Sequence, residues 1–176
     1  VASLPAVAFQ VLPVHRLWTA IADGRARLHL RMGLFELAEA DVRAGLGRLV
    51  GDALRGLRAG LVGKLAVVLG EAAHYGPAID ALREALRLAA AARTDDGPSQ
   101  PTLRQNLATL LARAGERDEA RALVLAELER VERGEVYGAE DIAMIRYAAG
   151  LWRLLDGAVD EGEALIVDAR ESLAAM

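Results

Sequence analysis

The feature that most constrains this 176-residue chain is a helical hairpin pattern that recurs at nearly constant spacing. Residues 103–128 hold two amphipathic patterns, with apolar residues at three- and four-residue intervals, joined around Gly115. Glycine suits a tight turn between helices because it adopts the left-handed conformation without steric cost. Gly33, Ala73, Gly115 and Gly157 form a series of such turn positions, spaced by 40, 42 and 42 residues. This period predicts a protein built from repeated hairpins.

Small residues stand at fixed distances from each turn position. Seven residues before the turn and five residues after it, every hairpin carries alanine or glycine: Ala26 and Ala38, Ala66 and Ala78, Ala108 and Ala120, Gly150 and Gly162. Small side chains let two helix axes approach closely, so these positions predict the crossing points of antiparallel helices. A third small position, twelve residues after the turn, is occupied by Gly45, Ala85 and Ala169 but fails at Glu127.

The composition favours helices over strands. Hydrophobic residues make up 53% of the chain and aromatic residues only 4%, because alanine and leucine dominate and both are strong helix formers. We predict an all-α fold of about four antiparallel hairpins that stack around a continuous core and curve into a superhelix. Pro13 is expected to open the first helix. The predicted organisation is a lead segment over residues 1–12 and a repeat domain over 13–176, with hairpins at about 13–51, 52–93, 101–133 and 138–175.

The small residues and the period together resemble the tetratricopeptide repeat, in its longer form of about 42 residues, over roughly residues 19–175. This resemblance implies a right-handed α-solenoid with a concave groove. Arg25 in the first hairpin departs from the pattern, because it occupies an apolar position. Arg146 and Arg153 do the same in the fourth hairpin, where Ile145, Ala149 and Trp152 fit better after a shift of one residue. Two registers for these first helices therefore stay open.

In proteins of the resembling family, ligands lie along the inner face formed by the first helix of each hairpin. Carrying those positions over gives a predicted binding groove of nine residues: Arg27, Arg31, Lys64, Gln105, Asn106, Thr109, Arg113, Tyr147 and Leu151. The cationic members suit carboxylates of an acidic segment or of a chain terminus, and the amides suit peptide backbone. The alternative is that these residues form solvated helix faces without a ligand.

The seventh predicted helix, near residues 139–155, is apolar almost all round. Met144, Leu154 and Leu155 lie on a side that the core-facing residues do not use. Exposed apolar patches of this kind usually mark an interface. We therefore expect a homodimer through the C-terminal hairpin, or docking of this hairpin against a continuation of the chain.

The formal net charge of −4 is unevenly distributed. Residues 1–88 carry 11 Lys and Arg against 8 Asp and Glu, a net charge of +3, whereas residues 89–176 carry 10 against 17, a net charge of −7. A non-specific nucleic-acid binder needs a basic face across the fold, so no nucleic-acid partner is expected. The asymmetry suits an acidic partner at the N-terminal half or head-to-tail self-contact, although solvated charge without a role is the commoner explanation.

The chain has no cysteine, which excludes disulfides and thiolate chemistry and suits a cytoplasmic location. Its longest stretch without ionised side chains, residues 1–15, is interrupted by Pro5 and Pro13. Such a stretch is too short to span a membrane and lacks the basic start of a signal peptide. No membrane partner is expected.

Motifs for catalysis and cofactor binding are incomplete. Glu71 and His74 form a single E-x-x-H, but a di-iron bundle needs a second such motif and further inward carboxylates. Residues 60–65 are similar to a phosphate-binding loop, yet Arg58 and Leu65 replace the required glycine and hydroxyl. We expect no catalytic site, no metal and no cofactor.

These patterns favour a non-catalytic scaffold that binds a peptide or protein segment in its concave groove. The alternative is a regulatory, ligand-sensing or self-association domain of a larger bacterial regulator. A fold of this kind does not by itself dictate which function applies.

Overall fold

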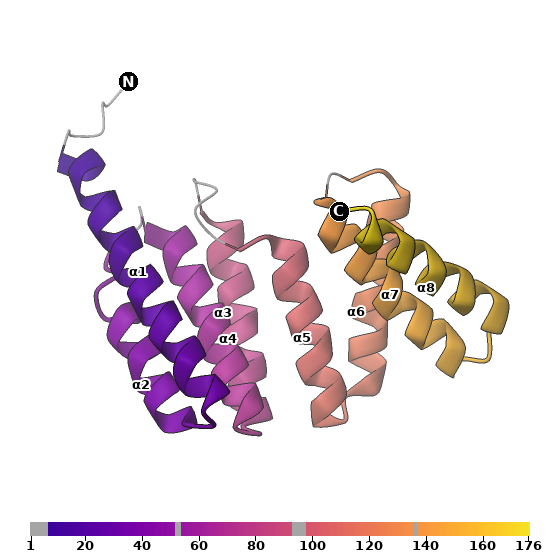
Figure 1. Ribbon diagram of the computed structural model, residues 1–176, viewed down its shortest axis with the longest axis horizontal. Helices are drawn as coiled ribbons and strands as arrows, with labels where there is room; N and C mark the ends of the chain where they lie inside the picture. Colours follow the sequence, from indigo (N-terminus) through magenta and orange to yellow (C-terminus); the bar gives the residue numbers. More distant parts are fainter. Residues whose placement is uncertain (1–6, 52–53, 93–97, 136) are drawn as a thin grey trace. The chain divides into compact units, whose positions relative to one another are not determined.

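The computed structural model describes residues 7–51, 54–92, 98–135 and 137–176. Across these ranges the regular structure consists of eight α-helices and contains no strand, which confirms the all-α prediction (Figure 1). The helices are α1 (Val7–Arg31), α2 (Phe35–Leu46), α3 (Arg55–Glu71), α4 (Tyr75–Ala90), α5 (Gln100–Ala114), α6 (Arg117–Glu132), α7 (Ala139–Leu155) and α8 (Val159–Ala174).

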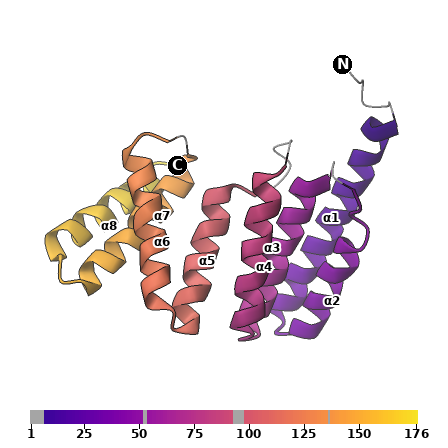
Figure 2. The ribbon, with the colours of Figure 1, turned by 180° about the vertical axis from the view of Figure 1, so that it is seen from behind.

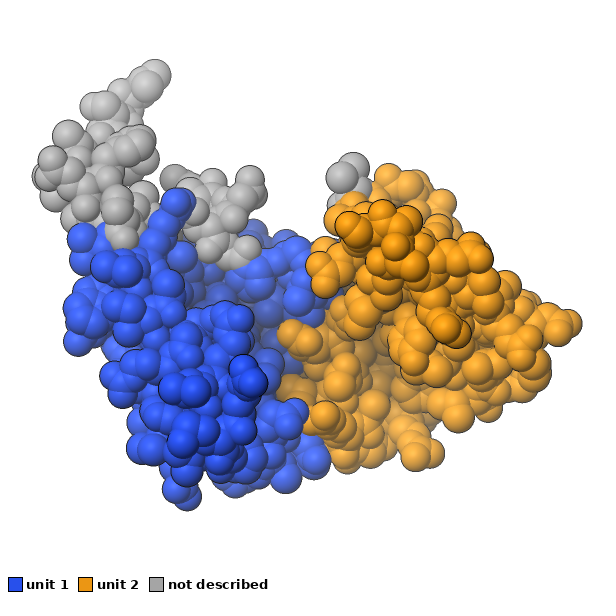
Figure 3. Space-filling view, viewed as in Figure 1, with its two compact units in different colours: residues 1–103 blue, residues 104–176 orange. Residues whose placement is uncertain are grey.

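Helices that follow one another in sequence pack against each other, as a series of hairpins requires. Helices α1 and α2, α3 and α4, and α7 and α8 form such pairs (Figures 1 and 2). Helix α3 also contacts both α1 and α2, and α6 contacts α7. The chain divides into two compact units, residues 1–103 and 104–176 (Figure 3).

The four predicted turn positions all adopt the left-handed conformation. The φ angles are +73° at Gly33, +61° at Ala73, +90° at Gly115 and +84° at Gly157. At each turn, the next residue donates its N–H to the carbonyl five residues earlier: Leu34 to His29 (2.9 Å), His74 to Leu69 (2.8 Å), Glu116 to Leu111 (2.9 Å) and Ala158 to Arg153 (2.9 Å). The turn residue itself donates its N–H to the carbonyl three residues earlier. The two bonds together form a Schellman motif, which satisfies carbonyls at the helix C-terminus.

The residue after each turn also begins the second helix of the hairpin. Leu34, for example, accepts a hydrogen bond from the N–H of Ala38 at 3.0 Å, and its own side chain makes no capping bond. The same backbone arrangement recurs at His74, Glu116 and Ala158. Every one of these turns is therefore closed by backbone hydrogen bonds.

The small residues lie buried at the helix crossings, as predicted. Ala26, Ala38, Ala66, Ala78 and Ala120 are fully buried, and Ala108 nearly so. In the fourth hairpin both positions are glycine. A Cβ atom added at Gly150 would lie only 2.8 Å from the carbonyl oxygen of Gly162, and one added at Gly162 would lie 2.8 Å from that of Gly150. Only glycine fits at these two positions without movement of the backbone.

The core of the first unit forms where α3 packs on the α1–α2 hairpin. Leu57, Leu61 and Val68 of α3 share one buried cluster with Val42 of α2 and with Leu49. Leu61 fills the space above Gly45, since a Cβ atom added at that glycine would lie 2.8 Å from Cδ1 of Leu61. The first helix of one hairpin therefore covers the preceding hairpin.

The core of the second unit decides the register of α7. Ile145 and Ala149 are buried in a cluster with Ala108, Val124 and Leu128, whereas Arg146 and Arg153 are only partly covered. The shifted register of the fourth hairpin is therefore the one that forms. Arginine heads stay near water while the apolar residues fill the interior.

Helix α1 begins earlier than predicted. It starts at Val7, so the predicted start at Pro13 is wrong and residues 7–12 are helical; residues 1–6 of the predicted lead segment lie outside the described residues. Proline has no backbone N–H, so one internal hydrogen bond is lost at Pro13, but residues 7–12 contain no glycine or proline that would end the helix. Among the described residues, no helix is both long and apolar enough to cross a membrane.

Candidate functional site

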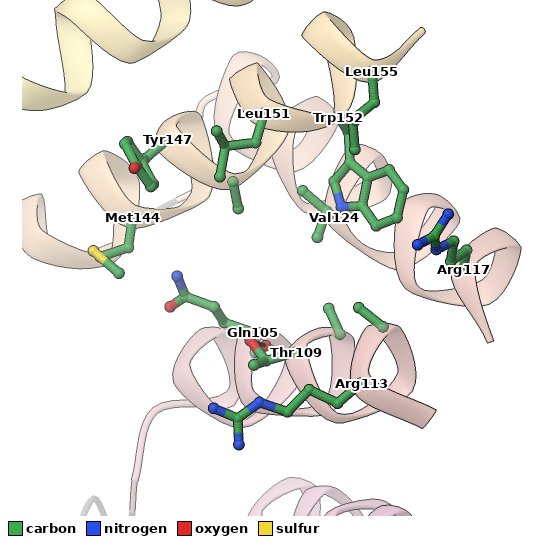
Figure 4. A pocket seen from close by; sticks show the side chains of 13 residues that line it. Gln105, Thr109, Arg113, Arg117, Val124, Met144, Tyr147, Leu151, Trp152 and Leu155 are labelled. Carbon is green, nitrogen blue, oxygen red and sulfur yellow. Dashed lines mark hydrogen bonds between the residues drawn. The ribbon is translucent and has the colours of Figure 1, made fainter. Parts of the chain in front are cut away.

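A pocket of about 600 Å³ opens in the second unit, between α5, α6 and α7 (Figure 4). It is larger than a second pocket, of about 330 Å³, in the first unit. The lining residues come from three helices: Gln105, Ala108, Thr109, Ala112 and Arg113 of α5, Arg117 and Val124 of α6, and Met144, Tyr147, Ala148, Leu151, Trp152 and Leu155 of α7.

The wall formed by α7 is apolar and exposed. Met144, Tyr147, Leu151 and Leu155 follow one another at intervals of three and four residues, so they share one face of the helix. Their exposed fractions run from 38% at Met144 to 76% at Leu155. A different face, which includes Ile145, is buried in the core. Helix α7 therefore uses one apolar face for folding and leaves a second one open to solvent.

The facing wall, formed by α5, is polar. Gln105, Thr109 and Arg113 are spaced by four residues and also share one face. The amide of Gln105 points toward α7 (Figure 4). The hydroxyl of Thr109 donates to the backbone carbonyl of Gln105 at 3.0 Å, which leaves its oxygen able to accept. This wall offers hydrogen-bonding groups to a ligand that rests on the apolar row of α7.

Small residues keep the pocket open. Ala108 and Ala112 of α5 and Ala148 of α7 line the pocket, together with Val124 of α6. Larger side chains at the three alanines would fill the space between the helices. The indole of Trp152 lies at the same end of the pocket as Arg117 (Figure 4). Arg117 is exposed and makes no ion pair with a described residue.

A buried ion pair lies beside the pocket. The Nε atom of Arg104 lies 2.6 Å from Oε1 of Glu127, with side chains that are 14% and 4% exposed. The hydroxyl of Tyr137 donates to Oε2 of Glu127 at 3.2 Å. Burial, then the charge of Glu127 and the hydrogen bond to it, raise the pKa of Tyr137 above its ordinary value. Glu127 is the residue at which the pattern of small positions fails. Its long side chain is accommodated in the interior because it pairs with Arg104.

The lining of this pocket suits a ligand with apolar and anionic groups. In the described part of the chain, no group of three or more His, Cys, Asp or Glu side chains is placed to hold a metal ion. The ionisable groups that line the pocket are Arg113, Arg117 and Tyr147. Two arginines beside an apolar surface can hold apolar side chains and a carboxylate at the same time.

Five of the nine residues predicted for the groove line this pocket: Gln105, Thr109, Arg113, Tyr147 and Leu151. Met144 and Leu155, which were predicted for self-association, line it as well. Asn106 is half-buried and is not among the lining residues. Leu154 lies against α8, because a Cβ atom added at Gly162 would come within 2.8 Å of its Cγ atom.

The remaining predicted groove residues lie in the first unit. Arg27 and Lys64 both pair with Asp23, with 3.0 Å between Nζ of Lys64 and Oδ1 of Asp23. Burial alone would raise the pKa of Asp23, but the hydrogen bonds and charges of Arg27 and Lys64 together lower it. Arg31 is exposed on the last turn of α1. Two of these three cations therefore already share one carboxylate within the protein.

Sequence reasoning missed Arg117 and Val124 as pocket residues. Both belong to α6, the second helix of its hairpin, whereas the resemblance places ligands on first helices only. The one available signal was Arg117 itself, a cation directly after the Gly115 turn and near the predicted groove residue Arg113. Trp152 was assigned to the core of its hairpin, and its ring is large enough to reach the pocket as well.

Comparisons with known proteins identify no relative: no family model matches the chain, and no curated protein matches it.

Proposed function

We propose that this chain is a non-catalytic interaction module, similar to tetratricopeptide repeats, that binds a peptide or protein segment in the pocket of the second unit. The observation that carries the proposal is the pairing of an exposed apolar row on α7 with a polar row on α5. The likeness to the repeat rests on identical turns and on small residues at the helix crossings.

The dimensions of the apolar row suggest the size of the ligand. Met144 and Leu155 stand eleven residues apart on α7, which corresponds to about 16 Å along the helix axis. A ligand helix of about three turns, with apolar residues at three- and four-residue spacing, covers that distance. Ligand side chains would rest on Met144, Tyr147 and Leu151.

The charges of the pocket suggest the polarity of the ligand. Arg117 lies near the Trp152 end, and the lining residues include cationic but no anionic side chains. A carboxylate of the ligand at that end would form charge-assisted hydrogen bonds with the guanidinium group. Polar groups elsewhere on the ligand would face the amide of Gln105 and the oxygen of Thr109.

A displayed library of random peptides, each about three helical turns long, tests this proposal directly. We expect the protein to enrich peptides with apolar residues at helical spacing and an acidic residue toward one end. Affinities of the enriched peptides are then measured by calorimetry. The absence of enrichment over the bare support would contradict the proposal.

Variants localise the binding. Leu151→Asp places a charge in the middle of the apolar row and should weaken an enriched peptide by about tenfold or more, or about 1.4 kcal/mol. Arg117→Glu should reduce the affinity of acidic peptides and leave that of neutral ones nearly unchanged. Val159→Asp is the matched control, because Val159 is an exposed apolar residue of the same unit that does not line the pocket. Equal binding by Leu151→Asp and the wild type would place the ligand elsewhere.

A further inference from the structure

Helix α1 exposes a row of apolar side chains to solvent. Val14, Leu17, Ile21 and Leu28 follow one another at helical spacing, and their exposed fractions are 52%, 60%, 41% and 57%. They lie on one face of the helix. A contiguous apolar face of this kind usually marks a contact surface.

The equivalent positions in the other hairpins show which kind of contact this face can make. Twelve residues before each turn stand Ile21, Leu61, Leu103 and Ile145. The last three are 1%, 1% and 3% exposed, whereas Ile21 is 41% exposed. Five residues before the turn, Leu28 is 57% exposed and its counterpart Val68 only 1%. In α3, residues at these positions pack onto the preceding hairpin, so the row on α1 has the register of a surface that receives a hairpin.

The complementary surface, onto which the first helix of a following hairpin packs, is exposed on the fourth hairpin. Nine residues after the first turn, Val42 is buried beneath α3, and sixteen residues after it Leu49 is buried as well. Their counterparts after Gly157 are Ile166, which is half-buried, and Leu173, which is 40% exposed. Helix α8 thus has the counterparts of Val42 and Leu49; Ile166 packs partly on Gly150 of α7, and Leu173 is exposed.

The two helices that carry these surfaces have opposite net charges. Helix α1 carries Arg16, Arg25, Arg27 and Arg31 against Asp23, a net charge of +3. Helix α8 carries Asp160, Glu161, Glu163, Asp168 and Glu171 against Arg170, a net charge of −4. Two α1 faces would repel one another, and so would two α8 faces. A contact between α1 of one copy and α8 of another is attractive.

We propose that copies of this chain associate head to tail, with the apolar row of α1 in one copy packed on the Ile166 and Leu173 face of α8 in the next. The occupant of each exposed face is therefore a second copy of this chain. The contact repeats the packing of α3 on the α1–α2 hairpin. Because it joins two different surfaces, an open assembly has one free surface at each end, to which further copies can add.

Sedimentation of the wild type across a range of concentrations tests this assembly. The average mass should rise beyond that of a dimer as concentration increases. An increase in salt from about 0.05 M to about 0.5 M should weaken the association, because the Debye length falls several-fold. A wild type that stays monomeric at the highest concentration would overturn the proposal, and so would a series that stops at the dimer.

Two variants that each block one surface make the test specific. Leu28→Glu places an acid on α1, opposite the acidic α8, and Leu173→Arg places a cation on α8, opposite the basic α1. Both residues are exposed within one chain, so helix content and melting temperature should match the wild type. Each variant alone should be monomeric.

A mixture of the two variants should associate one to one although each alone does not, because each variant keeps the surface that the other has lost. A mixture that stays monomeric would overturn the proposal, and so would self-association of Leu28→Glu alone through two α8 faces. Leu37→Glu is the matched control. Leu37 is 52% exposed on α2, and its counterparts in the third and fourth hairpins are Glu119 and Glu161. This variant should assemble as the wild type does.

Discussion

The first and third hairpins solve the same packing problem in opposite ways. In the first hairpin, Ala22 and Gly45 meet across the two helices, and a Cβ atom added at Gly45 would lie 2.8 Å from that of Ala22. The equivalent positions in the third hairpin are Arg104 and Glu127, which form a buried ion pair with 2.6 Å between Nε and Oε1. One pair lets the helices approach closely, whereas the other fills the space between them with two long side chains.

The difference shows that a repeat position specifies a contact between two helices more than it specifies a residue type. A small pair needs no partner, but an arginine and a glutamate are stable in the interior only together. Gln105 and Ala108 lie beside the ion pair and also line the large pocket. The hairpin that departs from the small-residue rule therefore also contributes the polar wall of the candidate site.

The largest effect is expected when the ion pair is broken. Glu127→Ala supplies the small residue found in the other hairpins but leaves the guanidinium of Arg104 buried without its carboxylate. We expect a loss of about 3 to 5 kcal/mol in the free energy of unfolding, measured by urea denaturation.

The double variant Arg104→Val, Glu127→Ala is the matched control, because it installs the residues that hairpin two has at these positions, Val62 and Ala85. It should recover most of the loss and unfold within about 1 to 2 kcal/mol of the wild type, since an apolar pair can replace a buried ion pair. A double variant as unstable as Glu127→Ala would show that the two hairpins are not equivalent here.

The second prediction concerns the glycine crossing of the fourth hairpin, where the other hairpins have alanine. Gly150→Ala should destabilise the protein by about 1 to 3 kcal/mol, because the new Cβ would lie 2.8 Å from the carbonyl oxygen of Gly162. Thermal unfolding measures this. Gly24→Ala in α1 is the control: no atom lies within 4 Å of its added Cβ, so alanine should stabilise the helix by about 0.5 to 1 kcal/mol. Equal changes in stability in the two variants would contradict the close contact between Gly150 and Gly162.

Much of the fold was predictable from the sequence because short-range rules set it. A residue with positive φ recurs at Gly33, Ala73, Gly115 and Gly157, and small residues mark the crossings at fixed distances from it. The start of α1 was not predictable, because Pro13 is a good first residue of a helix and local preference gives no reason to extend the helix before it.

The candidate site was predictable only in part. Gln105 and Tyr147 were correctly predicted to line the site from their positions in the repeat. The position of a residue in a helical repeat determines the direction in which its side chain faces. The pairing of Lys64 with Asp23 depends on which side chains meet between α1 and α3, and a pattern within one helix does not contain that information. For the same reason, the sequence showed Glu127 only as an exception to the pattern of small residues and did not show that it pairs with Arg104.

The third prediction compares turns. Ala73 holds φ +61° where the other three hairpins have glycine. Ala73→Gly removes the steric cost of this conformation but increases the freedom of the unfolded chain, so a net gain of about 0.5 kcal/mol is expected. Gly115→Ala, the reverse change in another hairpin, should cost about 1 kcal/mol. Chemical denaturation distinguishes the two signs, and a loss of stability in Ala73→Gly would contradict the equivalence of the turns.

The smallest effect appears only in alkaline solution. Burial and Glu127 raise the pKa of Tyr137, so the contribution of the neutral phenol is fully present below the ordinary tyrosine pKa of about 10 and is lost as pH rises through the raised value. In the double variant Arg104→Val, Glu127→Ala, the charge and the hydrogen bond of Glu127 are gone. Tyrosinate absorbance should then show Tyr137 ionising at lower pH than in the wild type. An unchanged titration would contradict the contact between these two residues.

The backbone closure of the four turns has a consequence for how such a chain can be lengthened or shortened. Because Leu34, His74, Glu116 and Ala158 begin their helices without a capping side chain, no turn depends on the identity of the residue that follows it. Segments cut at corresponding points of two hairpins would rejoin with the same local geometry. Unequal crossover within the gene can therefore add or delete one period of about forty codons and still encode intact turns.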